Sequence, residues 1–152
     1  MSQSTDAPVA PSILAMTYKN GLILRRWAGC WIDLAVLAGI LIGADGGLGN
    51  ATYQSTIWIW LGLCVLYFPV TEGVWGRSLG KVVTGTTVVT ASGRPPGVLK
   101  ATLRTITRLF EVNPVLFGGI PAGIVVLSSG YHQRVGDMWA GTYVVLTKDL
   151  GG

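Results

Sequence analysis

Charged side chains are scarce in this sequence: 12% of the 152 residues are charged and 50% are hydrophobic, with a mean hydropathy of +0.54. A soluble domain of this size would carry about 25% charged residues. We therefore expect an integral membrane protein with one domain, since the length leaves room for only a few spans of about 20 residues. The net charge is +4, and the basic residues flank apolar runs. This pattern favours anionic lipid headgroups over nucleic acid as partners.

Residues that carry chemistry are also few. The sequence has one histidine and two cysteines, and Cys30 and Cys64 lie in apolar runs without the spacing of a zinc or redox site, so both are expected to pack. His132, beside Tyr131, is expected to be a solvated residue at a membrane interface. Residues 76–81, GRSLGK, are one residue short of a phosphate-binding loop. We predict no enzyme, no bound metal and no cofactor.

The first 20 residues lack a long apolar run. Their only apolar stretch is residues 13–16, which is too short for the core of a signal peptide. We therefore expect residues 1–20 to form a mobile arm and not a cleaved leader. A single membrane domain is then expected over residues 21–148.

Two apolar runs are long enough to cross a bilayer, at about residues 24–42 and 55–75. Tyr53, Trp58 and Trp60 precede or begin the second run and Trp75 ends it, as in the aromatic belts of membrane proteins. Arg25 and Arg26 stand before the first run, whereas the connection between the two runs has no lysine or arginine. The positive-inside rule then predicts a cytoplasmic N-terminus.

The rest of the chain predicts a smaller unit on the same side. Residues 82–90 and 142–147 are rich in β-branched side chains and are predicted to pair as two strands. Residues 98–112 are predicted to form a basic amphipathic helix at the interface, and its lipid-binding candidates are Lys100, Arg104 and Arg108.

A third apolar run, about residues 113–129, is short and interrupted by Pro121 and glycines, which suits a broken or re-entrant segment. Strand pairing would keep the C-terminus cytoplasmic. The alternative is three simple spans with the C-terminus outside. The expected fold class is thus an all-α integral membrane protein with two long transmembrane helices, a third broken segment, an interfacial helix and a two-stranded element.

Four pieces in order give the chain a family resemblance: RRWAGCWID at 25–33, TEGVWGRSLGKVVTGTTVV at 71–89, LRTITR at 103–108 and QRVGDMWAGTYVV at 133–145. Together they resemble the RDD family of membrane proteins. The resemblance assigns the family's arginine to Arg26, with Arg25 as a second candidate, and its two aspartates to Asp33 and Asp137. Gly29 stands where the family usually has alanine. The resemblance implies a bacterial inner membrane and a role in transport, with cation/proton antiport among the proposals.

Under the cytoplasmic arrangement, five charged residues are expected to lie close together: Arg26, Asp33, Glu72, Arg134 and Asp137. Two interpretations stay open. The arginines could neutralise the carboxylates and hold the helices together, because buried charges must be paired. Alternatively, Asp33 with Glu72 or Asp137 could exchange a proton for a cation along a wet path.

Small residues recur at helical spacing on two apolar segments and are expected to pack helices; they are Ala35, Gly39, Gly43, Gly119 and Gly123. Two function classes follow. One is a transporter or transporter component for protons or monovalent cations, which would have to form a homo-oligomer because two or three spans make a poor pathway. The other is a non-catalytic accessory or structural subunit of a larger membrane complex.

Overall fold

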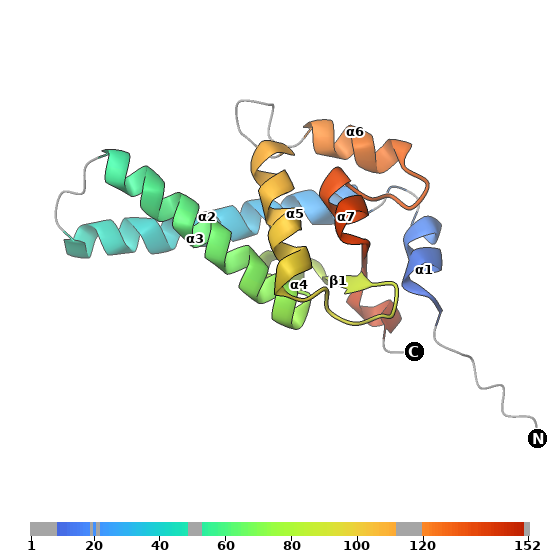
Figure 1. Ribbon diagram of the computed structural model, residues 1–152. Helices are drawn as coiled ribbons and strands as arrows, with labels where there is room; N and C mark the ends of the chain where they lie inside the picture. Colours follow the sequence, from blue (N-terminus) through green and yellow to red (C-terminus); the bar gives the residue numbers. More distant parts are fainter. Residues whose placement is uncertain (1–8, 19, 21, 49–52, 112–119, 151–152) are drawn as a thin grey trace, which may run out of the picture.

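The computed structural model describes residues 9–18, 20, 22–48, 53–111 and 120–150. This part of the chain is mostly helical and contains one two-stranded sheet (Figure 1). Its elements in chain order are α1 (Pro11–Thr17), α2 (Ile23–Leu48), α3 (Tyr53–Trp75), α4 (Leu79–Thr84), β1 (Thr86–Thr90), α5 (Val98–Glu111), α6 (Ile120–Ser128), α7 (Val135–Ala140) and β2 (Thr142–Leu146), followed by a 3₁₀ turn at Thr147–Leu150.

The two predicted apolar runs form two long helices that are candidates for membrane spans. Stretches of 21 residues in α2 (Ile23–Gly43) and 18 residues in α3 (Trp58–Trp75) are apolar and long enough to cross a membrane. They form a hairpin whose far end projects away from the other elements (Figure 1). Leu37, Cys64 and Phe68 form a buried apolar cluster between them, so Cys64 packs as expected.

The predicted strand pair is confirmed, with β1 and β2 antiparallel and Val88 opposite Val144. The first strand begins later than predicted, because Val82 and Val83 belong to α4. These two side chains lie on the exposed surface of α4, so the β-branched residues at these positions do not form part of a strand. Gly85 ends α4 in the left-handed conformation, with a φ of 67°, which glycine adopts at little cost.

The N-terminal segment is not wholly a free arm. Pro11 begins α1 at a position where its missing N–H costs nothing, and Ala15 is buried. The Tyr18 hydroxyl donates to Asp149 Oδ2 at 2.6 Å and accepts the Leu146 N–H at 3.2 Å. These contacts attach residues 9–18 to β2 and the C-terminal turn, which corrects that part of the prediction. Residues 1–8 lie outside the described residues.

Within the described part of the third apolar run, Ile120–Ser128 form α6, which has 9 residues. A helix of that length spans about 14 Å, roughly half of a hydrocarbon core. Residues 113–119 of the predicted segment lie outside the described residues, and a re-entrant path for the whole run stays a prediction.

Candidate functional site

Three carboxylates are buried in the region where the hairpin joins the smaller elements. Asp33 comes from α2, Glu72 from the last turn of α3 and Asp137 from α7, and each is at most 2% exposed. An unpaired buried carboxylate is very unfavourable, so each must have partners. Those partners define the site.

Glu72 is surrounded by three basic side chains from α4 and α5. Lys81 forms an ion pair with its Oε1, Arg108 Nη2 lies 2.6 Å from the same oxygen, and Arg104 Nε lies 3.4 Å from Oε2. Residues 72–81 reverse direction through a turn at Gly76, which brings Lys81 back to Glu72. One negative charge therefore faces three positive charges.

Asp137 binds arginines from three separate segments. Arg26 forms an ion pair with Oδ2, Arg104 Nη1 lies 2.7 Å from Oδ1, and Arg134 Nε lies 3.8 Å from Oδ2. Burial alone would raise the pKa of Asp137, but these guanidinium groups hold it well below its usual range. Arg104 joins both carboxylates, so Glu72 and Asp137 belong to one network.

Of the two adjacent arginines, only Arg26 enters this network. Arg26 binds Asp137 through Nη2, and its Nη1 donates to the carbonyl of His132 at 2.8 Å. Arg25 is exposed and donates to the Thr84 carbonyl at the end of α4 at 2.8 Å. The structure thus distinguishes the two candidates for the family's arginine in favour of Arg26.

Asp33 is held by neutral donors. Its carboxylate accepts hydrogen bonds from Ser78 Oγ at 2.5 Å, the Gly80 N–H at 2.7 Å and the Tyr67 hydroxyl at 2.8 Å. No basic side chain among the described residues forms an ion pair with it. The interpretation in which Arg26 or Arg134 neutralises Asp33 is therefore wrong, because both arginines bind Asp137. Asp33 instead fixes the beginning of α4.

Close backbone contact between α2 and α4 makes these bonds possible. A Cβ added at Gly80 would lie 1.9 Å from the carbonyl oxygen of Gly29. Only glycine permits this approach, which carries the Gly80 N–H to Asp33. The substitution of alanine by glycine at position 29, the departure from the family pattern, lies at this same crossing.

The prediction placed the basic face of α5 outward, toward lipid headgroups, whereas the structure places that face inward. Arg104 and Arg108 are buried in the network, whereas Leu99 is 78% exposed and Leu103 and Ile106 are also exposed. Buried carboxylates attract the arginines inward, and the apolar face is left outside. Arg104 and Arg108 are therefore not available to lipid headgroups, and only the exposed Lys100 keeps that predicted role.

The small-residue stripe on α2 does not pack against the described residues. Ala35, Gly39 and Gly43 are exposed, and a Cβ built at either glycine meets none of these residues within 4 Å. A Cβ built at the half-buried Gly123 likewise meets none of them, and Gly119 lies outside the described residues. His132, expected to be solvated, is half-buried and its Nδ1 lies 3.2 Å from the Val126 carbonyl oxygen.

Sequence reasoning missed Lys81 as a functional candidate. Burial and the neighbouring arginines lower the pKa of Lys81 to about 7 although Glu72 opposes the shift. A lysine with this pKa can gain or lose a proton near neutral pH. The only sequence signal was a basic residue nine positions after Glu72 in a glycine-rich turn.

Among the described residues, no group of three metal-binding side chains comes together.

Asp33→Asn provides a test of the corrected contacts. The new amide group would place an N–H donor against one of the three donors that now bind Asp33, and the other two hydrogen bonds would lose their charged acceptor. We therefore expect the free energy of unfolding to fall by about 1.5–3 kcal/mol. Thermal unfolding of the purified protein measures this. Adding Arg26→Met should not restore stability. Recovery in the double variant would mean that Asp33 and Arg26 form a pair after all.

One of three comparisons with known proteins found a match. The model of the family described as RDD matches residues 21–141, which spans all three carboxylates and every basic partner named above. The comparisons with curated proteins and with solved structures gave no match.

Proposed function

The chain belongs to the RDD family, and we propose that it is a proton-exchanging component of membrane transport in a bacterial inner membrane. Family membership and two apolar helices indicate a membrane protein. The observation that carries the transport proposal is the position of Lys81, a buried amine that pairs with Glu72, to which Arg108 also binds. Burial and the neighbouring arginines lower the pKa of this amine to about 7. It lines the same cavity as Asp33.

Lys81 suits proton exchange better than the three carboxylates. Arginines hold Glu72 and Asp137 in the ionised form, and Asp33 is occupied by fixed donors. When Lys81 loses its proton, Glu72 keeps Arg104 and Arg108 as partners, so the network remains paired. The excess of positive charge disfavours a cation beside Lys81, and the proposal therefore concerns the proton alone.

We infer the orientation in the membrane from the positions of the basic residues. Arg25 and Arg26 in the first turn of α2, and Lys100 on α5, would lie at the cytoplasmic surface, with both termini on that side. The outward apolar face of α5 would then contact lipid at the interface. Two spans cannot enclose a pathway alone, so the exposed Gly39 and Gly43 would contact another copy or a partner subunit.

Lys81→Arg tests proton exchange. Arginine keeps the positive charge beside Glu72 but does not lose a proton at ordinary pH. In vesicles with an internal pH dye, we expect an imposed pH gradient to decay faster with the wild-type protein than without it, and Lys81→Arg to abolish the difference. Lys148→Arg, at an exposed lysine, is the matched control. Full flux in Lys81→Arg would contradict the proposal.

Stability provides a second readout of the same group. The folded-state pKa of Lys81 is about 7 and the ordinary pKa of lysine is 10.5, so the unfolded chain binds more protons between these values. Stability should therefore rise with pH across that range. Lys81→Met should reduce this rise in the melting temperature, whereas Lys148→Met should leave it unchanged. Identical profiles for wild type and Lys81→Met would show that Lys81 does not titrate in this range.

The second candidate is a non-catalytic accessory subunit, and the extensive pairing within the network favours it. The single side chain of Arg104 contacts Glu72, Asp137 and Thr142. This arrangement makes the connection between the hairpin and the smaller elements rigid. A protein that conducts no protons in vesicles but co-purifies with a larger membrane complex would support this candidate.

A further inference from the structure

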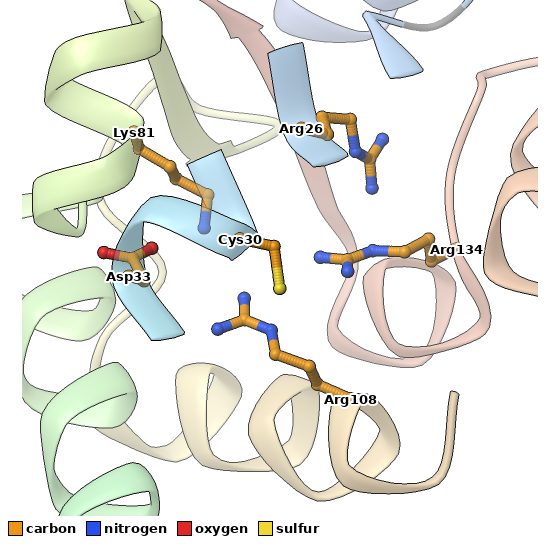
Figure 2. Close-up of a pocket in the computed structure, with 6 residues that line it drawn as sticks. All are labelled: Arg26, Cys30, Asp33, Lys81, Arg108 and Arg134. Atoms are coloured by element: carbon orange, nitrogen blue, oxygen red, sulfur yellow. The ribbon is translucent and has the colours of Figure 1, made fainter. Parts of the chain in front are cut away.

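A small cavity lies beside the network, outside the pairs themselves. It is lined by Arg26, Cys30, Asp33, Lys81, Arg108 and Arg134 (Figure 2). The space open to the centre of a water molecule is about 20 Å³. About 10–15 Å³ on this measure holds one water molecule, so the cavity admits one small occupant.

The surroundings of the cavity are strongly positive. The network contains five basic side chains, Arg26, Lys81, Arg104, Arg108 and Arg134, against the three carboxylates of Asp33, Glu72 and Asp137. Two positive charges are therefore in excess when every group is ionised. Buried charge of one sign without compensation is unfavourable, and an anion would compensate it.

One residue of the cavity lining has an unused donor. Arg108 Nε is buried and has no hydrogen-bond partner among the described residues. Arg104 Nη2 is also buried without such a partner, but Arg104 belongs to the adjoining network and not to the lining. Arg134 has only its 3.8 Å contact with Asp137 as an ion pair. Buried donors are nearly always satisfied in folded proteins, and an exception indicates an absent water or ion.

The side chains converge in a way that suits an anion. Figure 2 shows the guanidinium groups of Arg108 and Arg134 and the Cys30 sulfur directed toward one another, with the Asp33 carboxylate at one edge of the group. The Asp33 oxygens accept hydrogen bonds from Ser78, Gly80 and Tyr67. The carboxylate that lines the cavity is thus already bound by three donors.

We propose that this cavity binds one small monovalent anion of the size of chloride. Water would satisfy the donors but would leave the charge excess. Phosphate and a lipid headgroup share the negative charge but exceed the available space. The site stands on the cavity, the charges and the free donors, and does not depend on proton flux.

The pH dependence of binding follows from Lys81. The groups around this amine are Glu72 from α3, Arg104 and Arg108 from α5, and Arg26, Cys30 and Asp33 from α2, with Arg134 before α7. Protonation of Lys81 adds a positive charge to the cavity wall. The affinity for chloride should therefore increase as pH falls through about 7.

Chloride itself is the probe. The full chain, in nanodiscs of zwitterionic lipid, is titrated with chloride against gluconate at constant ionic strength, and bound chloride is followed by broadening of its NMR signal. We expect saturable binding by the wild-type protein. Arg134→Gln should weaken it about tenfold or more, because a charged donor is lost. Arg94→Gln, at an exposed arginine, should bind like wild type.

Cys30→Leu is the second variant, in case Arg134→Gln does not fold. It fills the cavity without changing charge and should abolish binding. No saturable binding by wild type, or unchanged binding in Cys30→Leu, would overturn the proposal. Displacement of chloride by phosphate, or by anionic lipid in the nanodisc, would assign the site to that larger anion and also overturn it. Chloride binding without proton flux would leave this site intact and reject the proposed transport function.

Discussion

Glu72→Gln should prevent most of the protein from folding. The substitution leaves Lys81, Arg104 and Arg108 buried around a neutral amide, and removing one partner from a buried ion pair costs about 3–5 kcal/mol. That is comparable to the total stability of many domains. We expect little monodisperse protein after detergent extraction, measured by size-exclusion chromatography, and a strongly lowered melting temperature in what remains.

A matched control separates this effect from any loss of negative charge. Asp149→Asn removes a carboxylate that is only half-buried and whose hydrogen bond comes from Tyr18, so it should have little effect. Adding Lys81→Met to Glu72→Gln removes one of the uncompensated cations and should restore part of the yield. A Glu72→Gln protein as stable as wild type would mean that the three cations do not depend on this carboxylate.

Gly80→Ala should be the second severe substitution. The new methyl group would lie 1.9 Å from the Gly29 carbonyl oxygen and 2.7 Å from its carbon, and backbone atoms cannot move aside as a side chain can. Helices α2 and α4 must separate, which lengthens the bonds from Ser78 and the Gly80 N–H to Asp33. We expect a loss of about 3 kcal/mol, at the upper end for an overpacked site.

Gly62→Ala is the control for this substitution. Gly62 also lies in a helix, α3, but its added Cβ meets nothing within 4 Å, and alanine is the better helix former. Thermal unfolding of the two variants side by side should show a large decrease only for Gly80→Ala. Equal melting temperatures would refute the tight crossing of α2 and α4.

Local sequence patterns predicted the elements whose formation depends on composition alone. The two spans followed from long apolar runs, and the pairing of residues 82–90 with 142–147 followed from β-branched runs that could be placed on one side of the membrane. The four quoted pieces identified the family. The positions of Arg26, Glu72, Arg134 and Asp137 in one network were likewise expected, and the structure brings them together.

Other features required the tertiary structure, because they depend on which carboxylate lies nearest to a given donor. The helical pattern of α5 showed a basic face and an apolar face, but it could not show that Glu72 and Asp137 would draw Arg104 and Arg108 inward. The short helix α4 forms over β-branched residues because Asp33 accepts the N–H of Gly80 at its beginning.

The sequence by itself thus determined a membrane protein with two apolar helices, a small paired sheet and a set of charges near one end. Only the tertiary structure decided that Asp33 binds neutral donors, that Lys81 joins Glu72, and that a positive cavity remains beside them. The physical reason is the separation along the chain over which each interaction acts. Hydrophobicity and β-propensity act on neighbouring residues, whereas the partner of a buried charge is chosen by distances of a few ångströms between segments far apart in the chain.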